Sequence, residues 1–185
     1  MTVTTFPGTT IETAKIERNS SRALFDGLFA ASGVTLSQIC VMTGLEPYLI
    51  QNWVKRGFVS SPQKRLYSRR QFARIVIINM LREVWQIDKI CSLIKVIGGT
   101  LDDDSDDLIG DDELYHRYVD MISDESINPT DPQSVARASQ GAASDFCEHN
   151  YGTRAQLSAI LCSMLYAHCA SRMREMSEQA LSEIM

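Results

Sequence analysis

Residues 35–57 read TLSQICVMTGLEPYLIQNWVKRG, and this stretch decides the fold of the region around it. Thr35 is a residue type that caps helix N-termini well. Gly44 tolerates the positive φ that ends a helix, and Pro47 suits the first turn of the helix that follows. The stretch therefore predicts two short helices joined by a tight turn.

The second of these helices is predicted to have two different faces. Helical spacing gathers apolar residues on the inward face: Leu49, Ile50, Trp53 and Val54. The outward face is polar and basic: Tyr48, Gln51, Asn52, Lys55 and Arg56. Gly57 ends the helix.

A basic loop and two further helices are expected next. Residues 58–67 are too short for a helix, include Pro62, and present Gln63-Lys64-Arg65 at their tip, which indicates a hairpin or wing. Ser68 is the N-cap of a long helix that reaches Trp85, and residues 87–97 form another amphipathic helix.

Basic residues are concentrated in this part of the chain. Residues 35–95 hold ten of the 18 Lys and Arg residues and three acids, in a chain with a net charge of −5. A basic helical region within an acidic protein is typical of a surface that binds phosphate.

Two short helices with a polar second helix are the pattern of a DNA-reading helix-turn-helix. Gln and Asn pair with adenine in the major groove, so Gln51 and Asn52 are the expected base contacts. The expected phosphate contacts, on the second helix, the wing and the start of the long helix, are Tyr48, Lys55, Arg56, Lys64, Arg65, Tyr67, Arg69 and Arg70.

Over about sixty residues the chain resembles the winged helix-turn-helix of MerR-type regulators. The matching residues are Thr35-Leu36-Ser37, Gly44-Leu45, Ile50, Trp53, Arg56-Gly57, Pro62, Arg65, Tyr67-Ser68, Phe72, Arg74-Ile75 and Ile87 to Ile94. The whole chain resembles an uncharacterised Firmicute family with a MerR-like N-terminal half. The resemblance implies a transcriptional regulator that binds a pseudo-palindromic promoter site in double-stranded DNA as a homodimer. Gln51 and Val54 depart from the residues that are usual at those places in MerR-type proteins.

The segment that follows the basic residues carries a strong negative charge. Eleven acids and a single Arg lie between Asp102 and Glu125. Four of the acids fit the spacing of an EF-hand calcium loop, namely Asp102, Asp104, Asp106 and Glu113. The stronger expectation is a hydrated acidic loop without metal, followed by a helix from about Asp111. Within it, His116 is expected to be exposed.

The chain is expected to be mostly α-helical, as a winged helix-turn-helix followed by a helical C-terminal half. We expect a mobile arm over residues 1–19, the DNA-binding module over 20–100, and the acidic segment with a dimerisation or effector region over 101–185. The last region ends in one long helix from Thr153. Its apolar stripe is Leu157, Ile160, Leu161, Met164, Leu165, His168, Met173, Met176 and Leu181.

Other classes of protein receive little support from the sequence. The sequence predicts no signal peptide and no membrane span, and five cysteines without a C-x-x-C pair indicate a reduced cytoplasmic protein. No catalytic motif is present, so neither an enzyme nor a cofactor is expected. Two alternatives stay open: a thiol or metal sensor using Cys162 and Cys169, and an adaptor that keeps the helix-turn-helix fold for protein contact.

Overall fold

The computed structural model describes residues 4–98, 108–147 and 152–184. This part of the chain contains eight helices and two sheets of two strands each, which confirms a mostly helical protein with a long terminal helix. In chain order the elements are β1 Thr4–Thr5, β2 Glu12–Thr13, α1 Ser20–Leu28, β3 Val34–Thr35, α2 Leu36–Thr43, α3 Pro47–Lys55, β4 Leu66–Tyr67, α4 Arg69–Leu81, α5 Ile87–Gly98, α6 Asp111–Ile122, α7 Pro132–Ala143 and α8 Thr153–Ser182.

The two short helices form where the sequence predicted them. The Thr35 side chain accepts from the backbone N–H of Gln38, and the Gln38 side chain accepts from the Thr35 N–H, so the two residues form a capping box at the start of α2. Gly44 ends α2 with φ 69°, and Pro47 is the first residue of α3. The turn between the helices thus has only three residues, 44–46.

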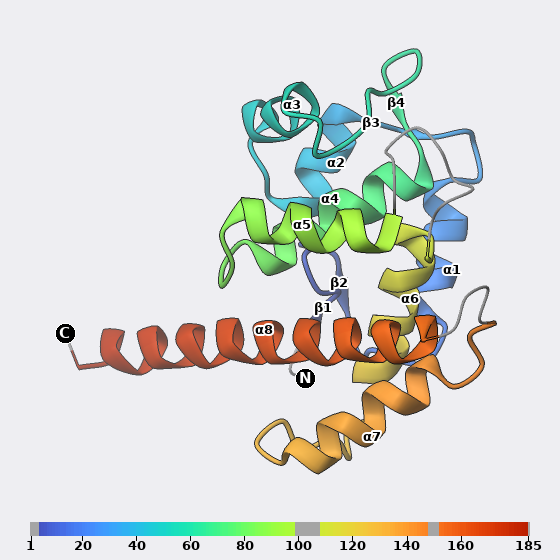
Figure 1. Cartoon of the computed structure of the whole chain (residues 1–185). Helices are drawn as coiled ribbons and strands as arrows, with labels where there is room; N and C mark the ends of the chain where they lie inside the picture. The colour runs from blue at the N-terminus through green and yellow to red at the C-terminus, as the bar shows by residue number, and fades with distance from the viewer. Residues whose placement is uncertain (1–3, 99–107, 148–151, 185) are drawn as a thin grey trace.

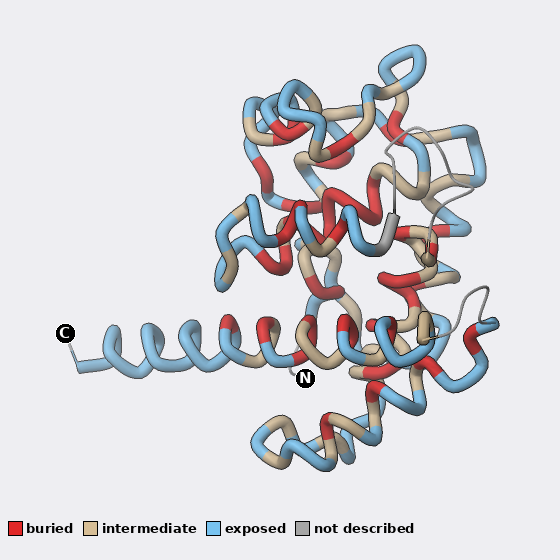
Figure 2. Tube along the Cα trace, in the orientation of Figure 1, coloured by how far each residue is buried: buried red, intermediate tan, exposed pale blue. Residues whose placement is uncertain are grey.

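Helix α4 is the centre of the molecule. All seven residues from Phe72 to Ile78 are buried, so this helix is covered on every side. It packs against α2, α5, α6 and α8 (Figure 1), and the buried segments of the tube converge on it (Figure 2). These four helices are therefore positioned by direct contact with α4, and α1, α3 and α7 pack against them in turn.

The N-terminal segment, which we expected to be a mobile arm, is folded over residues 4–13. Strands β1 and β2 pair with each other, and Phe6 is buried. The backbone N–H of Thr10 donates to the Met42 carbonyl at 2.8 Å, beside the α2–α3 turn. Asn79 of α4 donates to both the Gly8 carbonyl (2.9 Å) and the Thr43 carbonyl (3.0 Å). The segment is therefore part of the support of α2.

A buried ion pair joins α4 to α6. The Arg74 guanidinium donates to the Asp111 carboxylate from Nε at 3.0 Å, and Nη2 lies 2.9 Å from the same oxygen. Arg74 and Asp111 are 6% and 3% exposed. Arg74, one of the ten basic residues of residues 35–95, therefore balances a carboxylate in the core and faces no phosphate. Removing one partner of such a pair would leave a buried charge, at a cost of about 3–5 kcal/mol.

His116 is buried, so the expectation that it is exposed was wrong. Its ring is 2% exposed, its Nδ1 lies 2.9 Å from the Ser21 hydroxyl, and its edge meets the Phe25 ring with centroids 4.8 Å apart. Burial, together with the charges of Arg22 and Arg69, lowers the pKa of His116 from 6.5 to about 4. The imidazole is therefore neutral at pH 7.

The calcium-loop hypothesis is left largely untested. Three of its positions, Asp102, Asp104 and Asp106, lie outside the described residues. The fourth, Glu113, is engaged by Arg22 at 2.6 Å and by Arg117 at 2.9 Å. Within the described ranges, no group of three or more His, Cys, Asp or Glu side chains is arranged to hold a metal ion. In the same ranges, no helix is long and apolar enough to cross a membrane.

Replacing Gly8 with Ala should destabilise the fold strongly. Gly8 has φ +74°, and a Cβ there would lie 2.3 Å from the Val76 carbonyl oxygen of α4. We expect a loss of about 2–4 kcal/mol in the free energy of unfolding by urea. The matched control is Gly27→Ala in α1, where a Cβ meets nothing within 4 Å; it should stabilise the protein by about 0.5–1 kcal/mol. Equal effects would contradict the tight seating of the N-terminal segment.

Stability should fall as the pH drops from 6.5 to 4. The unfolded chain binds a proton at His116 with the ordinary pKa of 6.5, whereas the folded chain does so only near 4. The stabilisation is complete above pH 6.5, and about 3 kcal/mol is lost by pH 4. His168, whose pKa burial also lowers to about 4, adds a loss of the same sign.

The variant His116→Asn separates the contribution of His116 to this pH dependence from that of His168. The Asn side chain keeps an acceptor for Ser21 and does not titrate. Urea unfolding between pH 4 and 7.5 should then show about half the pH dependence of the wild type. An unchanged slope would mean that the pKa of His116 is the same in the folded and unfolded chains.

Candidate nucleic-acid interface

The outward face of α3 is exposed. Tyr48 is 65% exposed, and the other expected contact residues of this helix, Gln51, Asn52, Lys55 and Arg56, are exposed as well. Ile50 and Trp53 are 0% and 5% exposed and hold the opposite face in the core. The helical period thus separates the two faces as the sequence predicted.

The basic tip beyond α3 is a two-residue hairpin. Gln63 and Leu66 exchange both backbone hydrogen bonds, at 3.1 and 2.8 Å. Between them Lys64 and Arg65 have φ 50° and 66°, the pattern of a type I′ turn in which Asn-Gly is usual. Both side chains are exposed. Their left-handed backbone conformation is unfavourable for residues other than glycine, by roughly 1–2 kcal/mol for each residue.

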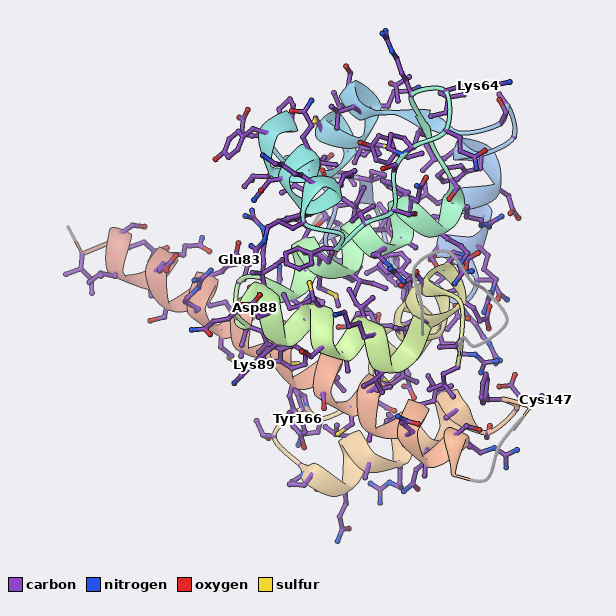
Figure 3. The ribbon with its side chains drawn as sticks, turned by 45° about the horizontal axis from the view of Figure 1, so that its top comes forward. Lys64, Glu83, Asp88, Lys89, Cys147 and Tyr166 are labelled. Atoms are coloured by element: carbon purple, nitrogen blue, oxygen red, sulfur yellow. The ribbon has the colours of Figure 1, made fainter. Side chains whose placement is uncertain are left out.

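The hairpin is anchored at its base. Strand β4 pairs with β3 through Val34 and Tyr67, and the Gln71 side chain donates to the Ser60 and Ser61 carbonyls at 2.9 and 3.0 Å. In Figure 1 the tip projects at the same end of the molecule as α3, away from α7 and α8, and in Figure 3 Lys64 marks this end. One side of the protein therefore presents both α3 and the hairpin tip.

Tyr67 does not belong to this surface. The residue is 3% exposed, and burial raises the pKa of its hydroxyl. Because strand side chains alternate in direction, Tyr67 points into the core while Leu66 is half-buried. The expected phosphate contact at Tyr67 is therefore wrong.

Several cations of the module have partners within the chain. Arg69 donates to Asp26 at 2.7 Å and lies 5.7 Å from the Phe25 ring centroid, so it ties α4 to α1. Arg56 stacks 4.4 Å over the Phe58 ring and is 3.4 Å from Asp88, although its side chain is still 45% exposed.

Arg70 is half-buried. The basic surface is thus smaller than the sequence suggested. It centres on Lys55, Arg56, Lys64 and Arg65.

Sequence reasoning missed how the α2–α3 turn is positioned. Asn79 holds the Thr43 carbonyl at the end of α2, and its Oδ1 accepts from Arg82 at 2.9 Å. A single Asn within the apolar run IVIINML was the available signal, because a buried amide needs partners.

Four of the five cysteines are poorly placed for sensing. Cys91 is buried, and Cys40, Cys162 and Cys169 are half-buried. Burial raises the pKa of the thiols of Cys40, Cys91 and Cys169. A raised pKa lowers the fraction of reactive thiolate, so this arrangement gives a thiol sensor no support.

A cavity of about 820 Å³ opens between the start of α1, α6 and α7. Its wall contains Arg22, Glu113, Arg117 and Asp145, and these charges pair with one another across it: Arg22 with Glu113 at 2.6 Å and Arg117 with Asp145 at 2.5 Å. Because its charges are balanced internally, the cavity does not indicate the charge of any ligand.

Comparison with known proteins identifies relatives of the central part of the chain. Residues 35–118, which run from the cap of α2 into α6, match the family described as "Domain of unknown function (DUF1836)". The chain is also 32% identical over 93 residues to the "Uncharacterized protein YkrK" of Bacillus subtilis (strain 168). That similarity covers 48% of this chain and 40% of the relative's length. No solved structure matches, and neither relative gives evidence for the MerR resemblance.

Replacing Lys64-Arg65 with Asn-Gly should stabilise the fold, because these residues adopt positive φ at little cost. We expect the double variant to gain about 1–2 kcal/mol in urea unfolding. As a control, Ser61→Ala changes the same exposed loop without touching the turn. If the Asn-Gly variant were less stable than the wild type, Lys64 and Arg65 would be making contacts that stabilise the fold.

Proposed function

We propose that this protein binds double-stranded DNA sequence-specifically as a winged helix-turn-helix regulator of transcription. The observation that carries the proposal is one exposed side that combines the polar face of α3 with the basic tip at Lys64-Arg65. A helix of nine residues fits the major groove, and its exposed amides match the edges of adenine.

Each element has a separate role in this proposal. Gln51 and Asn52 read bases, while Lys55 and Arg56 contact the phosphates that flank the groove. Lys64 and Arg65 contact the neighbouring backbone. The strained turn supports this role, because strain of this kind is retained where a side chain must be presented in a fixed direction.

Two copies acting together would read a pseudo-palindromic site whose half-sites lie roughly 34–36 Å apart, or a multiple of that. With the four exposed cations Lys55, Arg56, Lys64 and Arg65 on this side of each chain, a dimer would make on the order of eight phosphate contacts. Affinity should then fall on the order of 10³–10⁵-fold between 50 and 200 mM salt.

A second function, protein binding by the same side of the molecule, is favoured by one observation. Val41 on α2 is 78% exposed and Tyr48 on α3 is 65% exposed, so the side carries apolar as well as basic residues. An adaptor using these residues would bind its partner with little dependence on salt and without need of Lys64 or Arg65.

The first experiment is retention of fragmented genomic DNA by the purified protein at 50 and 200 mM salt, with sequencing of what is retained. Enrichment of a few fragments that share an inverted repeat would support a specific regulator. Retention of all fragments at 50 mM salt and of none at 200 mM salt would mean non-specific binding. No retention at either salt concentration would favour the adaptor.

Single substitutions should then separate the two kinds of contact on an enriched fragment. Asn52→Ala should cost about 1–3 kcal/mol and relax specificity at one position of the site. Lys55→Ala should weaken binding to all sequences. It should also reduce by about one the slope of the logarithm of affinity against the logarithm of salt concentration.

The matched control is Arg137→Ala on α7, an exposed cation on the helix that lies at the opposite end of the molecule from α3 in Figure 1. It should leave unchanged both the affinity and the slope of its logarithm against the logarithm of salt concentration. Equal losses from Lys55→Ala and Arg137→Ala would mean that only overall charge matters, and the assignment of α3 as the reading helix would be withdrawn.

A further inference from the structure

The C-terminal end of α2 is held by groups that come from other parts of the chain. A helix leaves the carbonyls of its last four residues without partners inside the helix. In α2 these are residues 40–43, and each of the four carbonyls accepts a hydrogen bond. The Cys40 carbonyl accepts from the backbone N–H of Gly44 at 2.9 Å, as is usual where a glycine ends a helix. The other three carbonyls are bound by Thr10 and Asn79.

Thr10 binds two of these carbonyls at once. Its hydroxyl donates to the Val41 carbonyl at 2.7 Å, and its backbone N–H donates to the Met42 carbonyl at 2.8 Å. Its methyl group lies against the turn, since a Cβ at Gly44 would be 3.2 Å from it. The side-chain amide of Asn79 donates to the carbonyl of the last residue of α2 at 3.0 Å. Two residues far from α2 in the sequence therefore occupy the positions that water often takes at a helix end.

The segment that carries Thr10 is itself fixed on the core. Strands β1 and β2 pair with each other, and the loop between them is held at two points. The Gly8 carbonyl accepts from Asn79 at 2.9 Å, and the Pro7 carbonyl accepts from the Tyr115 hydroxyl of α6 at 2.9 Å. These contacts give Thr10 a defined position relative to α4 and α6, and a single amide group of Asn79 joins the loop to the end of α2.

The direction of α3 depends on the end of α2. Only residues 44–46 separate the two helices, and α2 is the helix against which α3 packs most. A small rotation at this turn therefore moves the whole outward face of α3. Recognition by side-chain amides requires their positions to be held within roughly 0.5 Å and 10–20°. Hydrogen bonds to the last carbonyls of α2 act at the point where this precision is set.

We propose that Thr10 is a positioning residue for α3: it clamps the end of α2 and so fixes the direction in which the reading helix leaves it. The inference rests on the proposed function for one consequence, which is that the clamp raises the ratio of specific to non-specific DNA affinity. Thr10 is exposed, so water can replace its hydroxyl at the Val41 carbonyl. Loss of the hydroxyl should therefore change the free energy of unfolding little and leave the direction of α3 less well defined.

Hydrogen exchange tests the clamp in the absence of DNA. Thr10→Ala and Thr10→Ser differ by one hydroxyl group, so the Ser variant should restore what the Ala variant loses. The matched control is Thr13→Ala, because the Thr13 hydroxyl donates to the Lys15 carbonyl at 2.9 Å and not to α2. Backbone amides of residues 44–55 should exchange on the order of 2–10-fold faster in Thr10→Ala than in the wild type.

Exchange in α5 should be the same in all four proteins, and Thr10→Ser and Thr13→Ala should match the wild type throughout. Equal exchange of residues 44–55 in Thr10→Ala and Thr10→Ser would overturn the proposal. Faster exchange in Thr10→Ala that extends to α5 would also overturn it, because the hydroxyl would then support the whole fold and not the direction of α3.

DNA binding by the same variants tests the consequence for specificity. Thr10→Ala should lower the affinity for an enriched fragment on the order of 2–10-fold and change the affinity for an unenriched fragment of equal length less than about twofold. The slope of the logarithm of affinity against the logarithm of salt concentration should not change, since no phosphate contact is removed. Thr10→Ser should bind as the wild type does. An equal loss on both fragments would contradict a positioning role.

These outcomes can be told apart from failure of the proposed function. A wild type that retains no DNA, together with faster exchange of residues 44–55 in Thr10→Ala, would sink the DNA-binding proposal and leave the clamp standing. Specific retention by the wild type, with neither exchange nor affinity altered in Thr10→Ala, would do the reverse.

Discussion

The complete burial of α4 is the constraint on which the rest of the structure depends. A helix with residues 72–78 all buried must be covered on every side, and no single neighbour can do so. Helices α2, α5, α6 and α8 each cover part of it, and the N-terminal segment approaches Val76 so closely that only Gly8 fits. The orientation of the exposed face of α3 therefore depends on contacts made far from it in the sequence.

The basic residues of the module divide between two tasks. Arg74 and Arg69 hold α4 to α6 and to α1 by pairing with carboxylates, and Arg56 is partly engaged by Phe58 and Asp88. Lys55, Lys64 and Arg65 are left on the exposed side. A charge count from sequence therefore overstates a binding surface wherever opposite charges from distant segments fold against it. Here the acidic helix α6 neutralises part of the basic module.

The two ends of the molecule present different kinds of surface. The α3 side offers amides, cations and a strained turn, whereas the half of α8 beyond Ser171 is exposed on every side. Arg174, paired with Glu83 beyond the end of α4, connects the projecting half of α8 to the body of the protein.

Local sequence determined the elements of this protein. The caps at Thr35 and Ser68, the turn at Gly44 and Pro47, the polar face of α3 and the long terminal helix all follow from neighbours within four residues, which is the range over which helix capping and periodicity act. Only the tertiary structure decided the burial and pairing of residues whose partners lie far along the chain. Tyr67 and His116 became buried, Arg74 met Asp111, and the N-terminal segment folded onto α4 and the α2–α3 turn. The physical reason is that burial and ion pairing depend on which distant segments come into contact. The periodicity of a single helix contains no information about those contacts.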